Sequence, residues 1–192
     1  MRAQLKGQYQ QVQHLIDKLE QQQIHIVAFG KVSTGKSSLL NALLGEKHFS
    51  TSPLHGETKN NKPLDWQSMQ KQSIVLIDTP GTDEFDGDAR ELMAKQAAKQ
   101  ADIVLFLLSG DISDSELQQL NWIASPEKAV LLVLNKSDLY TPDELNLIGD
   151  SLLQKTKHLN VNIVTVAADP RAQTIIIQQA DGSEEQQATK AQ

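Results

Sequence analysis

The sequence contains no cysteine. This absence excludes disulfide bonds, thiolate metal sites and a cysteine nucleophile. It fits a protein of a reducing compartment, and we expect a cytoplasmic location.

Long apolar runs are missing as well. The longest extend from Ile103 to Leu108 and from Val130 to Leu134, whereas a membrane-spanning helix needs about 20 apolar residues. The N-terminal residues Met1 to Lys6 are not followed by the apolar core of a secretory signal. We therefore expect a soluble chain that reaches a membrane only through a part of the protein outside this sequence.

The sequence has fewer positive than negative side chains. It contains 18 lysine and arginine residues and 24 aspartate and glutamate residues, which gives a net charge of −6. General binding to nucleic acid requires cationic side chains that displace counterions. The sequence therefore gives no direct indication of a nucleic-acid partner, although the net charge does not exclude a local basic patch.

What the sequence does contain is an alternation of apolar strands and helices. Strands are predicted at 24–29, 73–78, 103–108, 129–135 and 161–166, and a further strand around Trp66. Helices are predicted at 36–44, 88–100, 113–124 and 142–158. Continuous apolar strands between helices predict an α/β domain, here residues 24–170, with a mainly parallel sheet covered on both faces.

Two segments flank this domain. Residues 1–23 predict an amphipathic helix, because Leu5, Tyr9, Val12, Ile16 and Leu19 follow heptad spacing. This helix packs on its own domain in the interpretation that we favour, or on a partner helix or a second copy. Residues 171–192 predict an extension, partly disordered or truncated from a longer protein, with one strand at 174–179 and a frayed polar end.

The run Gly30-Lys31-Val32-Ser33-Thr34-Gly35-Lys36-Ser37, followed by Ser38, matches the pattern G-x-x-x-x-G-K-[ST] between a strand and a helix. Its glycines let backbone N–H groups turn toward phosphate oxygens, and the helix N-terminus adds partial positive charge. Lys36 is expected to contact the β- and γ-phosphates and Ser37 to bind Mg²⁺. Alone, this loop predicts a nucleoside triphosphate site.

Two further motifs follow apolar strands. Asp78-Thr79-Pro80-Gly81 offers a carboxylate for the Mg²⁺ shell and a glycine N–H that can approach the γ-phosphate. In Asn135-Lys136-Ser137-Asp138, the Asp138 carboxylate can accept two hydrogen bonds from guanine, which adenine cannot supply. Asn135 can tie this base loop to the phosphate loop, and the Lys136 stem can cover the base. All three motifs fall at the carboxyl ends of strands, where ligands of open α/β sheets bind.

The order of these motifs resembles the translation-factor-related class of P-loop GTPases. The stretch from Gly30 to Gly45 is similar to the Era-like, septin-like and dynamin-like branches, which include bacterial HSR1-related GTP-binding proteins. The resemblance covers about residues 24–168 and implies a Ras-like domain with a six-stranded sheet. It also implies GTP or GDP and Mg²⁺ as ligands.

The resemblance assigns further residues. Thr58, in the irregular stretch from Lys47 to Pro63, is the expected switch threonine that binds Mg²⁺ and senses the γ-phosphate, with Thr51 as the alternative. Lys36, Thr58 and Gly81 are then the catalytic residues. Ala167 and Ala168 stand where the family places Ser-Ala, and the Ala168 N–H is expected to face guanine O6. The histidines of the irregular stretch, His48 and His55, are expected to be solvated.

The expected function is a GTP-hydrolysing switch, and three observations qualify it. Thr82 replaces the glutamine that positions water in Ras-type proteins, which implies slow hydrolysis unless an activating partner or a homodimer stimulates it. Ser33 stands where related proteins help a potassium ion to bind, so potassium stimulation is a further expectation. A binding module that does not hydrolyse GTP, acting through the N-terminal helix, and an ATPase remain the alternatives.

Overall fold

The computed structural model describes residues 23–51, 62–67, 73–81, 87–125, 128–170, 172–178 and 184–190. The predicted N-terminal helix, Thr58, His55 and Thr82 lie outside these residues. In the part that is described, no helix has the length and apolar content to cross a membrane.

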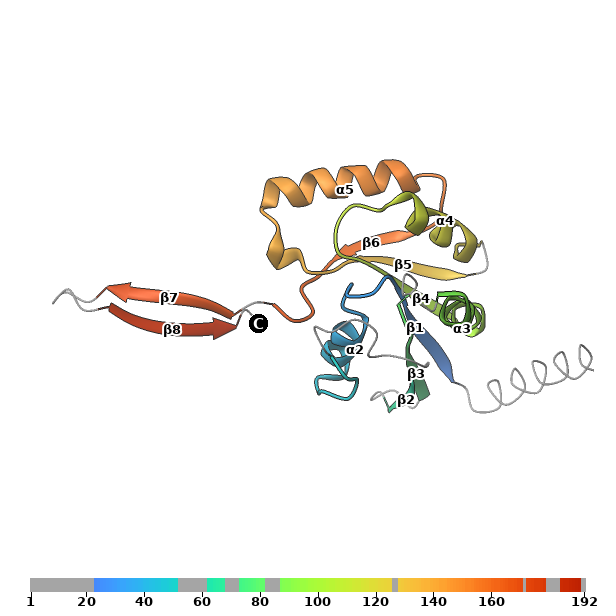
Figure 1. The fold of residues 1–192 in the computed structure, drawn as a ribbon, viewed down its shortest axis with the longest axis horizontal. Coiled ribbons are helices and arrows are strands. Elements are labelled where there is room, and N and C mark those ends of the chain that lie inside the picture. The colour runs from blue at the N-terminus through green and yellow to red at the C-terminus, as the bar shows by residue number, and fades with distance from the viewer. Residues whose placement is uncertain are drawn as a thin grey trace, which may run out of the picture.

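A six-stranded sheet forms the centre of the domain, as the sequence predicted (Figure 1). Its strand order is β2-β3-β1-β4-β5-β6. The strands are β1 (Ile24–Gly30), β2 (Lys62–Gln67), β3 (Ser73–Asp78), β4 (Ile103–Leu108), β5 (Ala129–Leu134) and β6 (Asn162–Thr165). Every neighbouring pair is parallel except β2 with β3, which is antiparallel. Trp66 lies on β2, so the strand expected around it is confirmed.

Four α-helices of the described residues cover the sheet, and their distribution over its two faces is unequal. The helices are α2 (Lys36–Leu44), α3 (Gly87–Gln100), α4 (Asp114–Ile123) and α5 (Pro142–Thr156). Side chains of α3, α4 and α5 share one buried cluster with Val27, Phe106 and Leu132 of the sheet. The other cluster joins α2 to Ala28, Leu105 and Val133. Both faces are therefore covered, but only α2 among the described helices packs on the second face.

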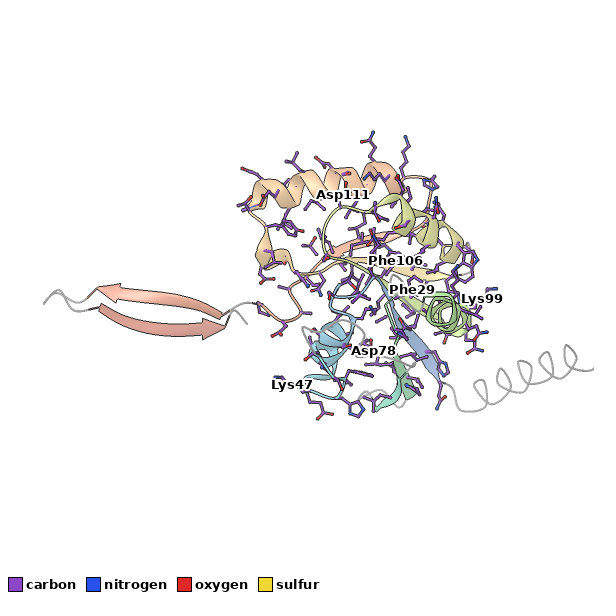
Figure 2. All side chains as sticks on the ribbon, in the orientation of Figure 1. Phe29, Lys47, Asp78, Lys99, Phe106 and Asp111 are labelled. Atoms are coloured by element: carbon purple, nitrogen blue, oxygen red, sulfur yellow. The ribbon has the colours of Figure 1, made fainter. Side chains whose placement is uncertain are left out.

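Successive side chains of a central strand point to opposite faces of the sheet, and each face carries one of the two apolar clusters. The central strands are therefore apolar on both faces. Phe29 of β1 and Phe106 of β4 are fully buried. Their ring centroids lie 5.5 Å apart, inside the cluster formed with α3 (Figure 2). Burial of two aromatic side chains in contact makes this pair a major part of the core.

The helix ends follow from local sequence. Ser113 caps α4 and Thr141 caps α5, each in a capping box with the glutamate three residues later, and Pro142 occupies the first turn of α5. Helix α2 ends at Gly45, whose φ of 74° is the left-handed conformation that suits glycine. These boundaries agree with the sequence predictions within two residues at each end.

The C-terminal extension differs from its prediction. Strand β7 (Ala172–Gln178) pairs antiparallel with β8 (Glu184–Lys190), and Figure 1 shows this hairpin projecting away from the sheet. The expectation of a frayed end is therefore wrong for residues 184–190. It failed because strand pairing uses backbone N–H and C=O groups, which a polar segment offers as well as an apolar one.

Candidate nucleotide-binding site

The loop between β1 and α2 has the backbone that close approach to an anion requires. Gly30 has a φ of 149°, Ser33 of 62° and Gly35 of 91°. A Cβ atom on Gly30 would lie 2.5 Å from the Leu107 carbonyl oxygen, and one on Gly35 would lie 2.3 Å from Nδ2 of Asn135. Neither glycine therefore leaves room for a side chain. Ser33 adopts the left-handed conformation at a cost of about 1–2 kcal/mol, a strain that recurs at ligand-binding loops.

The N-terminus of α2 is left open to an anion. Its N-cap is Gly35, which supplies no side-chain cap, and no acidic residue lies in the first turn of this helix. The first N–H groups of a helix need acceptors and carry partial positive charge. This helix end can therefore bind phosphate oxygens.

Lys36 places a buried ammonium at the same helix end. Its side chain donates to the carbonyl oxygens of Gly30 at 3.1 Å and of Lys31 at 2.8 Å. Only 7% of Lys36 is exposed. The Thr34 hydroxyl also donates to the Lys31 carbonyl, at 2.9 Å. The loop is thus folded around the amine that the sequence assigned to the phosphates.

Ser37 and Asp78 meet across the edge of the sheet. The Ser37 hydroxyl donates to Oδ2 of Asp78 at 2.6 Å, from the start of α2 to the end of β3. Asp78 is 1% exposed, and its Oδ1 atom is buried and accepts no hydrogen bond from the described residues. A hydroxyl beside a carboxylate is an oxygen donor set of the kind that Mg²⁺ prefers. These two residues therefore fit the ion that the motifs imply.

Gly81 lies directly against the phosphate loop. A Cβ atom on Gly81 would lie 2.2 Å from Cγ2 of Val32 and 2.7 Å from the Val32 nitrogen. The preceding turn is fixed by Thr79, whose hydroxyl donates to the Ala28 carbonyl at 2.7 Å and which is fully buried. The end of β3 is thereby held beside Val32, with the Gly81 backbone directly against the Val32 backbone and side chain.

Asn135 joins three segments of the site. Its Nδ2 donates to the Thr34 carbonyl at 2.9 Å, and its Oδ1 accepts the Ala168 N–H at 3.0 Å. The side chain is buried, with 2% exposed. The link from base loop to phosphate loop that the sequence predicted is confirmed.

The same contacts refine the expectation for Ala168. Its N–H is used by Asn135 in this structure, so it can reach a guanine oxygen only by sharing or exchanging that partner. Ala167, the neighbouring replacement for the family serine, is partly buried.

The remaining base-loop residues form a short 3₁₀ helix, η1 (Ser137–Leu139). Lys136 precedes it with a φ of 62°, and Asp138 is exposed in its first turn. The loop is anchored by the Ser137 N–H, which donates to the Val166 carbonyl at 3.1 Å. The Asp138 carboxylate is therefore carried on a fixed backbone at the surface of the site.

A cavity of about 290 Å³ adjoins these motifs. It is lined by Ser38 at the end of the phosphate loop, by Lys47 and Thr51 after α2, and by Ala168 and Asp169 after β6. Its walls thus come from both the phosphate side and the base side of the sheet edge.

Asn41 anchors the segment that follows α2, a role that was not predicted from the sequence. Asn41 is buried in α2, where its Oδ1 accepts the N–H groups of His48 and Phe49 at 2.9 and 2.7 Å. Its Nδ2 donates to the Phe49 carbonyl at 2.8 Å. A polar residue among the leucines of a short helix was the signal that could have identified it, because a buried amide requires partners.

The expected switch residues are only partly placed. Thr51 and His48 are exposed, the latter with its ring edge against Phe49 at a centroid distance of 5.3 Å. Thr58, His55 and Thr82 lie outside the described residues. The choice between Thr58 and Thr51 therefore stays a prediction.

The chain is similar to a known family of GTPases. The sequence profile of the family described as 50S ribosome-binding GTPase matches residues 25–136, more than half of the chain. The tRNA modification GTPase MnmE of Dichelobacter nodosus is 34% identical in an alignment of 154 residues, and the match covers 72% of this chain and 34% of that protein. GTPase Era of Geotalea daltonii is 33% identical in an alignment of 135 residues, and the match covers 66% of this chain and 45% of that protein. The chain spans about a third to a half of the length of these relatives.

Solved structures give the same result. Era of Aquifex aeolicus bound to GDP and AlF₄⁻ superimposes with a TM-score of 0.68 and 28% identity, over 77% of this chain and 52% of that one. Toc33 of Arabidopsis thaliana with GDP and Mg²⁺ has a TM-score of 0.60 and 21% identity, over 91% of this chain and 85% of that one. The first structure is a complex with a guanine nucleotide, and the second supports the fold alone.

Proposed function

The chain belongs to the P-loop GTPase family described as 50S ribosome-binding GTPases, and from this premise we propose that it binds GTP and GDP with Mg²⁺ and hydrolyses GTP. The observation that carries the proposal is the Asn135 side chain, which joins the Thr34 carbonyl to the Ala168 N–H. A loop that reads the base is thereby coupled to a loop that holds phosphates.

In this proposal the phosphates lie at the N-terminus of α2. Backbone N–H groups from Gly30 to Ser38 donate to phosphate oxygens, and the ammonium of Lys36 exchanges carbonyl partners for the β- and γ-phosphates. Its present partners, the carbonyls of Gly30 and Lys31, already hold it at this loop. Binding therefore needs little reorganisation of the lysine.

Ser37, Asp78 and Thr58 would hold Mg²⁺, Ser37 and Thr58 as ligands and Asp78 through water. The bound ion neutralises charge on the β- and γ-phosphates. The Ser37 hydroxyl must then release the Asp78 carboxylate that it now contacts at 2.6 Å. The Gly81 N–H would contact the γ-phosphate from beside Val32, a role supported by the absence of room for any side chain there.

Guanine would be read by Asp138, whose carboxylate accepts two hydrogen bonds from the base, while the Lys136 stem covers one face and Ala167 and Ala168 line the edge. We assign the nucleoside to the cavity that extends from Ser38 to Asp169. Its position between the phosphate loop and the loop after β6 supports this assignment.

The rate of hydrolysis is a separate part of the proposal. Thr82 follows Gly81 where Ras-type proteins place a water-positioning glutamine. We propose that the unaided reaction is slow and that an activating partner or a homodimer accelerates it. Potassium binding with help from Ser33 is a further candidate source of acceleration.

Single-turnover phosphate release, with GTP and Mg²⁺ bound, tests the activity. We expect a slow release above the buffer rate that increases with protein concentration or in potassium relative to sodium. Equal rates in sodium and potassium over a range of protein concentrations would remove potassium from the proposal, and a rate per protein that does not change with protein concentration would remove the homodimer. The absence of release from a stable GTP complex would favour the alternative, a binding module that does not hydrolyse GTP, for which the missing glutamine is the supporting observation.

A further inference from the structure

The second residue of the phosphate loop makes a contact outside the site. The Lys31 ammonium donates to the Ser113 hydroxyl at 2.9 Å and lies 3.4 Å from Oε2 of Glu116. Ser113 and Glu116 belong to the N-terminal cap of α4. Ser113 lies 82 residues after Lys31 in the chain. The side chain of a phosphate-loop residue is therefore directed to a helix rather than to the loop interior.

This contact differs from an exposed ion pair. The side chain of Glu116 is only 8% exposed and that of Lys31 27% exposed. Glu116 is also fixed by the capping box, in which its Oε2 accepts the Ser113 N–H at 2.9 Å. A carboxylate already held in one orientation loses little conformational entropy when it pairs, so the usual weakness of surface ion pairs is reduced.

The backbone of Lys31 connects the contact to the site. Its carbonyl oxygen accepts the Lys36 ammonium at 2.8 Å and the Thr34 hydroxyl at 2.9 Å. A displacement of residue 31 would move the acceptor that both groups share. The loop conformation at Lys36 is therefore coupled to the cap of α4 through one residue.

We propose that Lys31 is a positioning residue, whose side chain tethers the phosphate loop to Ser113 and Glu116 of α4 and holds the loop ready for nucleotide. This proposal rests on the proposed function, because its effect is measured as nucleotide binding. The tether acts on the part of the loop that both GDP and GTP use. It therefore raises the affinity for both nucleotides by a similar factor.

An untethered Lys31 could instead bind a phosphate directly, and the two roles predict opposite effects of one substitution. In Glu116→Gln the tether is weakened while the shape of the capping residue is kept. The tether predicts that this variant binds nucleotide more weakly. If the Lys31 ammonium instead binds a phosphate directly, Glu116 competes with the phosphate for that ammonium. Glu116→Gln should then bind nucleotide more tightly.

The test measures dissociation constants of fluorescent GDP and of a non-hydrolysable GTP analogue, with Mg²⁺, for the full chain. We expect Lys31→Met and Glu116→Gln each to weaken both nucleotides by about threefold to tenfold, the range of a charged hydrogen bond with partial exposure. Lys31→Arg should restore most of the affinity. The double variant should be no weaker than the weaker single variant, because both substitutions remove the same contact.

Lys128→Met is the matched control, since Lys128 donates to the carbonyls of Lys99 and Ala101 at the start of β5, at the opposite end of the parallel strands from the phosphate loop. It should bind nucleotide as the wild type does. Unchanged affinity in Lys31→Met, losses that add in the double variant, or tighter binding in Glu116→Gln would each overturn the tether. If Lys31→Met does not fold, the direction of the Glu116→Gln effect still decides. A wild-type chain that binds no guanine nucleotide would instead overturn the proposed function.

Discussion

The side-chain amide of Asn135 donates a hydrogen bond to the backbone carbonyl of Thr34, 101 residues earlier in the chain, at 2.9 Å. Its oxygen accepts the Ala168 N–H, so both ends of the amide are used and its orientation is determined by its partners. The loops after β1, β5 and β6 are thereby joined at one buried side chain. The integrity of the proposed guanine site should depend on it.

Asn135→Ala should therefore destabilise the domain and weaken nucleotide binding together. The substitution leaves the buried Thr34 carbonyl and the partly buried Ala168 N–H without this partner, at a cost of about 2 kcal/mol. Affinity for GDP should fall by at least about tenfold, the factor that corresponds to 1.4 kcal/mol. Urea unfolding and fluorescent GDP titration measure the two effects.

Asn121→Ala is the control for this substitution. Asn121 bonds the His158 ring at 2.7 Å on the exposed side of α4. Its loss should change the unfolding free energy by less than about 0.5 kcal/mol, as for surface substitutions, and leave GDP binding intact. Equal behaviour of the two alanine variants would remove Asn135 from the site.

Asp138→Asn should change the base that the site prefers. An asparagine cannot accept both hydrogen bonds from guanine, but it can pair with xanthine, which offers a carbonyl where guanine has an amine. GTP affinity should fall by about a hundredfold or more, and xanthosine triphosphate should bind better than GTP. Competition of both nucleotides against fluorescent GDP measures the preference. Unchanged GTP affinity would refute the assignment of guanine to Asp138 and reopen the ATPase alternative.

The sequence predicted the three motifs and the sheet because these depend on short-range spacing and on runs of apolar residues. Gly30, Asp78 and Asn135 each follow a strand, and parallel strands bring their carboxyl ends to one edge. The partners of the Asn41 and Lys31 side chains could not be found in this way. These partners lie across a loop or on another helix, and no periodicity records such contacts. Strand β8 was missed because its residues are polar, although its backbone pairs with β7.

Gly81→Ala should reduce GTP binding more than GDP binding. The added Cβ atom would meet Val32 at 2.2 Å from Cγ2 and 2.7 Å from the nitrogen, so the loop after β3 must move away from the phosphate loop. Only GTP has the γ-phosphate that the Gly81 N–H is proposed to contact. GTP affinity should fall by about tenfold, equal to a lost charged hydrogen bond, while GDP affinity stays within about twofold.

Gly149→Ala provides the matched control, because a Cβ atom there meets nothing within 4 Å and Gly149 lies inside helix α5. Alanine should stabilise this helix by about 0.5–1 kcal/mol without an effect on either nucleotide. The same loss of GTP and GDP affinity in Gly81→Ala would mean that the glycine supports the loop in general and does not sense the γ-phosphate.

The pH dependence of stability should reveal the contact between the loop before α4 and helix α5. Burial acts to raise the pKa of the Asp111 carboxyl, but hydrogen bonds from Lys155 and Ser151, the Lys155 charge and the Ile112 N–H together lower it below its ordinary value of 3.8. A lowered pKa in the folded state stabilises the fold above pH 3.8, and this contribution is lost as the pH falls through the folded-state value.

Because Asp111 is 45% exposed, solvent screening limits the contribution to at most about 1 kcal/mol. The wild type should thus be slightly more stable than Asp111→Asn at pH values about one unit or more above the ordinary carboxyl pKa, and the difference should shrink in acid. Urea unfolding of both proteins over this range measures it, and a difference that grows as the pH falls would contradict the assigned direction.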